Sequence, residues 1–281
     1  MPFLIFYDLK YMGKIHNLKQ ELATIENTVA DFSKQLREHY SNYLNLLSQS
    51  VYKQLILATY QVCTQSYPQE FLSLSYSQQQ KTQEEIKNLA RLGQEKIVNI
   101  LEKSDKSLNQ SEENDTKVIT DPELLIQWND LVESEINQCL DRLSMKINNL
   151  LQRAKILPHR LPSQVIEMAI RAEEVGQAVS GTPNILSVIV EAERQRLEDE
   201  DEDNEEEDQG AMFLEKITRL SAIRLRLIEI EFADSSLSLE HSQIRKLLER
   251  INQVQKHYHR KQRECAIAEA ESAWRACWTE S

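Results

Sequence analysis

Hydrophobic residues recur at alternating steps of three and four along the first part of the chain. The residues between them are mostly polar or charged, as at Lys19, Glu21 and Glu26. This alternation places the apolar side chains on one helix face and is the a/d pattern of a coiled coil. The apolar positions are Ile15, Leu18, Leu22, Ile25, Val29, Phe32 and Leu36. The pattern predicts a long helix with a narrow apolar seam.

Beyond Leu36 the apolar surface widens. Tyr43 and Leu47 contribute to it, and residues 51–62, VYKQLILATYQV, are apolar on more than one side. A helix that is apolar over most of its surface is usually buried among several neighbours. We therefore expect several helices to meet here, and Tyr43 and Leu47 are candidate contacts for a protein partner.

A second heptad pattern lies near the C-terminus, and we expect it to pair antiparallel with the first and to close a coiled-coil stalk. Its apolar positions are Leu237, Ile244, Leu247, Ile251, Val254 and Tyr258. The spacing leaves open whether the two seams pair within one chain or between the chains of a homodimer.

Helix breakers are scarce, with 5 Gly and 6 Pro in 281 residues. Glycine and proline are the residues that most weaken helix interiors. The predicted fold class is all-α, with long antiparallel helices forming a coiled-coil stalk plus a small helical bundle. Asp121 and Pro122 have the residue types of a helix start and predict one there.

Two segments have features of β-strands. Val188, Ile189 and Val190 are β-branched, and residues 223–232 alternate between apolar and polar. Considered alone, neither segment has a partner strand, and a lone strand leaves its backbone groups unpaired. We therefore predict a helical hairpin over residues 164–196 and a helix over residues 211–232.

These patterns together predict five parts of the chain. They are an N-terminal long helix with a helical return (1–103), a polar linker (104–121), a helix and helical hairpin (122–197), an acidic disordered loop (198–210) and C-terminal long helices (211–281).

The formal charge of −12 is concentrated in one place. Residues 198–208 read EDEDEDNEEED, which is ten acids in eleven residues, and the rest of the chain is close to neutral. Such a run acts as a solvated spacer, docks a basic partner by long-range attraction, or holds a divalent cation. The absence of ligand spacing argues against the cation, and the other two interpretations remain open.

Residues 241–263 carry the opposite charge. Their cations are Arg245, Lys246, Arg250, Lys256, Arg260, Lys261 and Arg263, and Glu249 is the one acid among them. A basic helix face binds nucleic-acid phosphates or an anionic membrane. Alternatively, it is the solvated back of a paired helix. Further along, Trp274 and Trp278 are four residues apart, so they lie on the same helix face. They either form a docking anchor for a partner or attach the last helix to its own bundle.

No catalytic, nucleotide-binding or metal-binding motif accompanies these patterns, so no enzyme activity and no cofactor are expected. His257 and His259 are two residues apart and do not share a helix face. The 4 Cys are too sparse for a disulfide framework. We expect reduced thiols and a cytoplasmic location.

The passage LPSQVIEMAIRAEEVGQAVSGTPNIL (residues 161–186), with the opening FLIFYDL and the closing AWRACWTES, resembles a family of all-helical proteins found in cyanobacteria. The resemblance implies a cytoplasmic setting and assigns no activity or functional residue. From the sequence we expect a non-enzymatic scaffold or adaptor that binds other proteins, with a homodimer as one arrangement. The alternative is peripheral binding to an anionic membrane or nucleic acid through residues 241–263.

Overall fold

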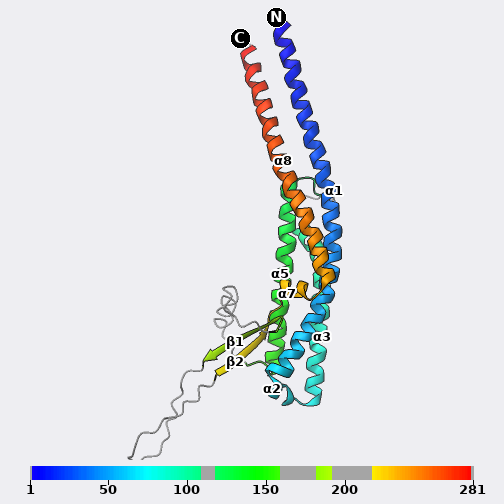
Figure 1. Ribbon diagram of the computed structural model, residues 1–281, viewed down its shortest axis with the longest axis vertical. Helices are drawn as coiled ribbons and strands as arrows, with labels where there is room; N and C mark the ends of the chain where they lie inside the picture. The colour runs from blue at the N-terminus through cyan, green and yellow to red at the C-terminus, as the bar shows by residue number, and fades with distance from the viewer. Residues whose placement is uncertain (1, 109–117, 159–181, 192–216, 280–281) are drawn as a thin grey trace, which may run out of the picture. The chain divides into compact units, whose positions relative to one another are not determined.

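The computed structural model describes residues 2–108, 118–158, 182–191 and 217–279, and in these the fold is a helical bundle of the all-α class (Figure 1). The elements are α1 (Pro2–Gln61), a π-helical turn η1 (Val62–Ser66), α2 (Pro68–Leu72), α3 (Tyr76–Val98), α4 (Ile100–Leu108), α5 (Pro122–Arg153), β1 (Ile185–Glu191), β2 (Ile217–Ile223), α7 (Leu227–Phe232) and α8 (Ser235–Thr279).

The chain forms two compact units, each assembled from segments that are distant in sequence. Unit 1 comprises Met1–Tyr52, Leu92–Cys139 and Ile230–Ser281. Unit 2 comprises Lys53–Arg91 and Leu140–Glu229.

In unit 1, α1 and α8 lie side by side and antiparallel (Figure 1). Lys19 pairs with Glu269 at 2.8 Å, and the hydroxyl of Tyr258 donates to Glu26 at 3.0 Å. Along this pair, residue numbers rise on one helix as they fall on the other. The two apolar seams predicted from the sequence therefore meet within one chain, while their supercoiling stays a prediction.

The wider part of α1 in unit 1 is held by a partly buried polar centre on α4 and α5. Asp105 accepts hydrogen bonds from Arg37 Nη1 at 2.7 Å and from Trp128 Nε1 at 2.8 Å. The Arg37 guanidinium also lies 4.6 Å from the Trp128 ring centroid. Residues 104–108 thus belong to α4, and the prediction that the linker begins at residue 104 is wrong. These residues are mostly polar, so the sequence did not indicate that Asp105 has partners on α1 and α5.

The predicted start of α5 is confirmed. Asp121 Oδ1 accepts from the backbone N–H groups of Glu123 at 2.7 Å and of Leu124 at 3.3 Å. These bonds satisfy donors that the first helical turn leaves unpaired.

Unit 2 contains the main departure from the sequence prediction. β1 and β2 pair antiparallel, with Ile185 opposite Ile223 and Glu191 opposite Ile217. Residues 185–191 and 217–223 are therefore strands, and the helices predicted over them are wrong. Each segment is the partner that the other needed, although 25 residues lie between them. The remaining parts of the predicted hairpin, residues 164–181 and 192–196, and the acidic run lie outside the described residues.

Two side chains of unit 2 from outside the sheet form hydrogen bonds with the backbone of β2. The Asn148 amide accepts from Ile223 N at 2.9 Å and donates to Ile223 O at 2.8 Å. The Tyr67 hydroxyl accepts from Ser221 N at 2.8 Å and donates to Ser221 O at 3.1 Å. These side chains take the place of a third strand and join the hairpin to α5 and to the end of η1.

Asn184 closes the base of the hairpin. It has a φ of 61°, a left-handed conformation that asparagine tolerates better than most residues. Its backbone carbonyl accepts from Arg224 N at 3.0 Å, and its side-chain oxygen accepts from Arg226 N at 3.1 Å. The chain is thereby turned from β2 toward α7.

Candidate functional sites

Tyr43 and Leu47, the sequence candidates for partner contact, are part of the unit 1 core. Their relative exposures are 1% and 0%. The Tyr43 hydroxyl donates to Glu231 at 2.5 Å, and His241 Nδ1 lies 2.7 Å from the same carboxylate. Neither side chain offers surface to another protein in this fold, so the apolar surface that these two residues add to α1 is covered within the chain.

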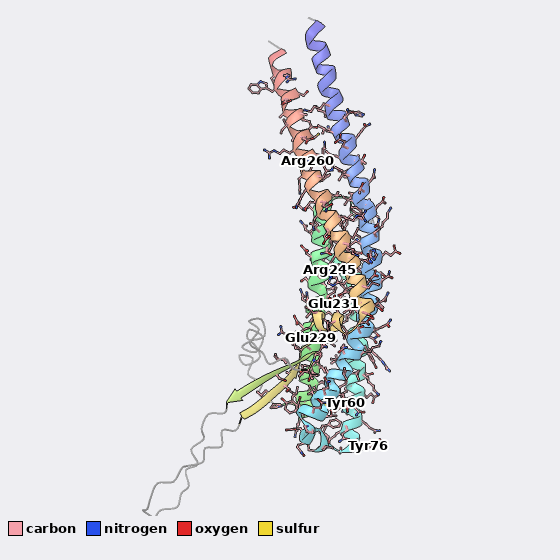
Figure 2. All side chains as sticks on the ribbon, viewed as in Figure 1. Tyr60, Tyr76, Glu229, Glu231, Arg245 and Arg260 are labelled. Carbon is pink, nitrogen blue, oxygen red and sulfur yellow. The ribbon has the colours of Figure 1, made fainter. Side chains whose placement is uncertain are left out.

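Glu231 illustrates the electrostatics of this core. Burial alone would raise the pKa of its carboxyl group. Hydrogen bonds from His241 and Tyr43, together with the charge of Arg245, outweigh burial and hold the pKa below its usual value. Glu231 and Arg245 are marked in Figure 2. Burial is also the main reason that the pKa of Tyr43 is raised. The arrangement keeps the carboxylate charged and its neighbours fixed, which is a structural role.

The seven cations of the predicted basic face divide into two groups. Lys261 pairs with Glu21 at 2.8 Å and with Glu264 at 3.0 Å, and the Arg250 guanidinium lies 4.9 Å from the Phe32 ring centroid. These two cations serve the contact between α1 and α8. The others, Arg245, Lys246, Lys256, Arg260 and Arg263, are exposed, as is Arg250, and Arg260 lies 4.0 Å from Glu264 on the same helix.

An outward-facing set of α8 residues combines charge with apolar surface. Arg260, Arg263, Ile267 and Trp274 recur at steps of three, four and seven, so they share one helix face; we name them the outer stripe. Arg260 is marked on α8 in Figure 2. Ile267 is 49% exposed and Trp274 is 69% exposed. The Trp278 side chain lies outside the part of the structure that is described.

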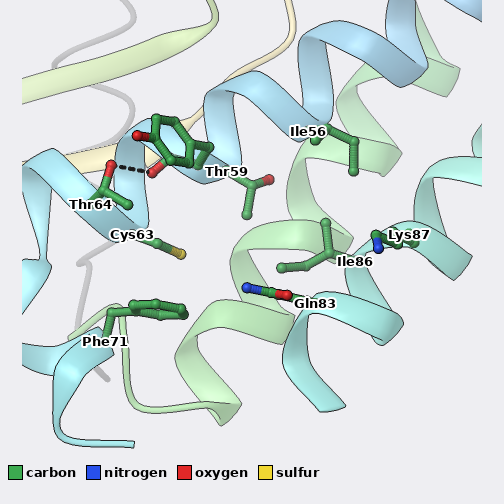
Figure 3. Close-up of a pocket in the computed structure, with 9 residues that line it drawn as sticks. Ile56, Thr59, Cys63, Thr64, Phe71, Gln83, Ile86 and Lys87 are labelled. Carbon is green, nitrogen blue, oxygen red and sulfur yellow. Dashed lines mark hydrogen bonds between the residues drawn. The ribbon is translucent and has the colours of Figure 1, made fainter. Parts of the chain in front are cut away.

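Unit 2 contains a cavity that sequence reasoning missed. Its volume is about 390 Å³, and it lies where α1 passes into η1, facing α3 (Figure 3). Thr59 comes from the last turns of α1, Cys63 from η1 and Phe71 from α2, while Ile86 and Lys87 come from α3. A π-helical turn has no recognisable sequence pattern, and such turns are frequent at functional sites.

The cavity wall is largely apolar. Burial raises the pKa of Cys63 to about 11, so its thiol is neutral at pH 7. The Thr59 hydroxyl donates to Leu55 O at 2.7 Å, and the Thr64 hydroxyl donates to Tyr60 O at 2.8 Å. Both hydroxyl protons are therefore used within α1 and η1 and are not offered to the cavity.

Two classes of site are not found in the described parts of the chain. No group of three or more His, Cys, Asp and Glu side chains there is placed to hold a metal ion. None of the helices described is both long and apolar enough to cross a membrane.

Comparisons of the chain with protein-family models, with curated proteins and with solved structures give no match.

Proposed function

We propose that the protein is a non-enzymatic adaptor that binds another protein through the outer stripe of α8. The observation that carries this proposal is the exposure of Trp274 and Ile267, 69% and 49%, on the helix face away from the seam with α1. Cys265 and Ala268 on that seam are buried against Leu18. Ile267 and Trp274 therefore lie on a different face of α8 from that seam.

The residue types of the outer stripe support protein binding. Tryptophan and arginine are the residues most enriched at the energetic centres of protein interfaces. Arg260 and Arg263 lie on the same face as the two apolar side chains. A partner that fits this face presents an apolar groove bordered by carboxylates, because opposite charges favour encounter and fix the orientation of the complex.

Site-specific photocrosslinking tests the proposal. A photoreactive phenylalanine analogue is placed at Trp274 and, in a matched control, at Leu239, which is also on α8 and is 63% exposed. We expect one discrete crosslinked product from position 274 in cells, and its loss when Arg263→Glu is added. Equal products from both positions, or none from position 274, would contradict the proposal.

The molar mass of the purified protein shows whether the partner is a second copy of the chain. Light scattering after size-exclusion chromatography gives the mass at low and at high salt. A dimer that becomes a monomer on Trp274→Ala identifies a homodimer through the outer stripe. A monomer at both salt concentrations points to a different protein as the partner.

The alternative function is binding to an anionic membrane or nucleic acid through residues 241–263. It is supported by the exposed cations, such as Lys246 and Lys256, and weakened by those already engaged, Lys261 and Arg250. Vesicles containing phosphatidylserine and duplex DNA are suitable probes. Under this alternative, binding falls steeply with salt concentration and is reduced by Lys246→Glu together with Lys256→Glu. Absent or salt-insensitive binding removes the alternative.

A further inference from the structure

We propose that the cavity of unit 2 binds a small amphiphilic carboxylate, with its aliphatic body in the cavity and its carboxylate at the α3 side of the opening. The volume, about 390 Å³, is within the range of roughly 300 to 1,000 Å³ typical of small-molecule sites. The proposal concerns a different surface from the outer stripe and does not depend on it.

The apolar body is predicted by the walls. Ile56 on α1, Phe71 on α2 and Ile86 on α3 surround the cavity, and Ile86 is 5% exposed. The Cys63 thiol and Thr59 add no charge and no free hydroxyl proton, as described above. A chain of methylene groups is suited to such a surface, because transferring it from water removes apolar area from the solvent.

The anionic head is predicted by α3. Gln83 and Lys87 are one helical turn apart and exposed, on either side of the buried Ile86 (Figure 3). Among the described residues that line the cavity, Lys87 is the one side chain charged at pH 7, and no carboxylate joins it. A ligand carboxylate here accepts hydrogen bonds from the Lys87 ammonium and the Gln83 amide.

The turn that carries Cys63 ends at a residue fixed by hydrogen bonds. The π-helical turn closes with a 2.9 Å bond from Tyr67 N to Val62 O. Tyr67 is then fixed by the two hydrogen bonds of its hydroxyl to Ser221. Tyr67 is a positioning residue, since it fixes the turn that carries Cys63 without lining the cavity itself.

Calorimetric titration with decanoate, and with decanol as the uncharged ligand, tests the proposal. We expect saturable binding of both ligands to the wild-type protein. Lys87→Gln should weaken decanoate binding by up to about fivefold, the effect of one exposed ion pair, and leave decanol binding unchanged. Lys81→Gln is the matched control, since Lys81 is exposed on the same helix and does not line the cavity. Ile86→Trp should abolish binding of both ligands by filling the cavity.

Thiol alkylation gives a second measurement that needs no substitution. Decanoate should slow the alkylation of buried Cys63 by iodoacetamide at pH 8.5, while the exposed Cys277 reacts at an unchanged rate. Failure of decanoate and decanol to bind or to protect Cys63 would overturn the proposal. Equal losses of decanoate affinity in Lys87→Gln and Lys81→Gln would overturn the assignment of the carboxylate.

Discussion

Two stretches of α1 in unit 1 use charged side chains in opposite ways. Near the N-terminus, Lys19 and Glu269 pair with 61% and 48% of their side-chain surface exposed. Further along, Arg37 and Asp105 pair with 19% and 20% exposed, and Trp128 donates to the same carboxylate. An ion pair therefore contributes to stability through the groups that its removal would leave without a partner, and not through the distance between its two charges.

The largest expected effect is that of Asp105→Ala in the inner stretch. It leaves the Arg37 guanidinium and the Trp128 N–H without their acceptor in a partly buried place. We expect a loss of about 2 to 4 kcal/mol of unfolding free energy, somewhat below the ~3–5 kcal/mol of a fully buried pair. Urea unfolding followed by circular dichroism measures it. A loss as small as that of an exposed pair would remove the contrast between the two stretches.

A smaller, pH-dependent effect is expected at Glu231. Its folded pKa lies below the unfolded value of about 4.3, so its contribution to stability is present above that pH and is lost as the pH falls through the folded pKa. Glu231→Gln should therefore cost about 1 to 2 kcal/mol at pH 7 and much less at pH 3. Urea unfolding at the two pH values measures the difference. An equal cost at both would show that the charge of Glu231 contributes nothing.

The smallest effect is expected in the outer stretch. Lys19→Glu places a second carboxylate beside Glu269. It should lower the melting temperature by under about 2 °C at low salt and should have no detectable effect at 1 M salt. The exchanged pair, Lys19→Glu with Glu269→Lys, should restore the wild-type value. If the exchange gave no recovery, residues 19 and 269 would not be neighbours in solution and the antiparallel register would be wrong.

The sequence predicted those features that follow from repeated local spacing. The heptads of α1 and α8 predicted their pairing, and Asp121 and Pro122 predicted the start of α5. The strands were missed because each segment was judged by itself. A strand is stabilised by pairing with another strand, and here 25 residues separate the two segments. Side-chain acceptors such as Asn148 complete the sheet and cannot be identified from pattern alone.

Of the candidate sites, too, only some could be predicted from the sequence. The exposure of Trp274 agrees with its interpretation as an anchor, which remains a proposal. Tyr43 and Leu47 were misinterpreted because an apolar surface does not indicate whether its partner is in the same chain. The cavity depends on a π-helical turn and on packing among α1, α2 and α3, for which the residues carry no local signal. The resemblance to a cyanobacterial family also stays a prediction.

The antiparallel pairing of α1 with α8 has a consequence for the synthesis of the protein. Glu26 and Tyr258, which are hydrogen bonded in the folded molecule, are 232 positions apart in the chain. At a translation rate of about 5 to 20 residues per second, the ribosome needs on the order of ten seconds or more to make the intervening chain. Throughout that interval the apolar seam of α1 is unpaired, so chaperones that bind exposed apolar helices have time to reach it before its own partner emerges.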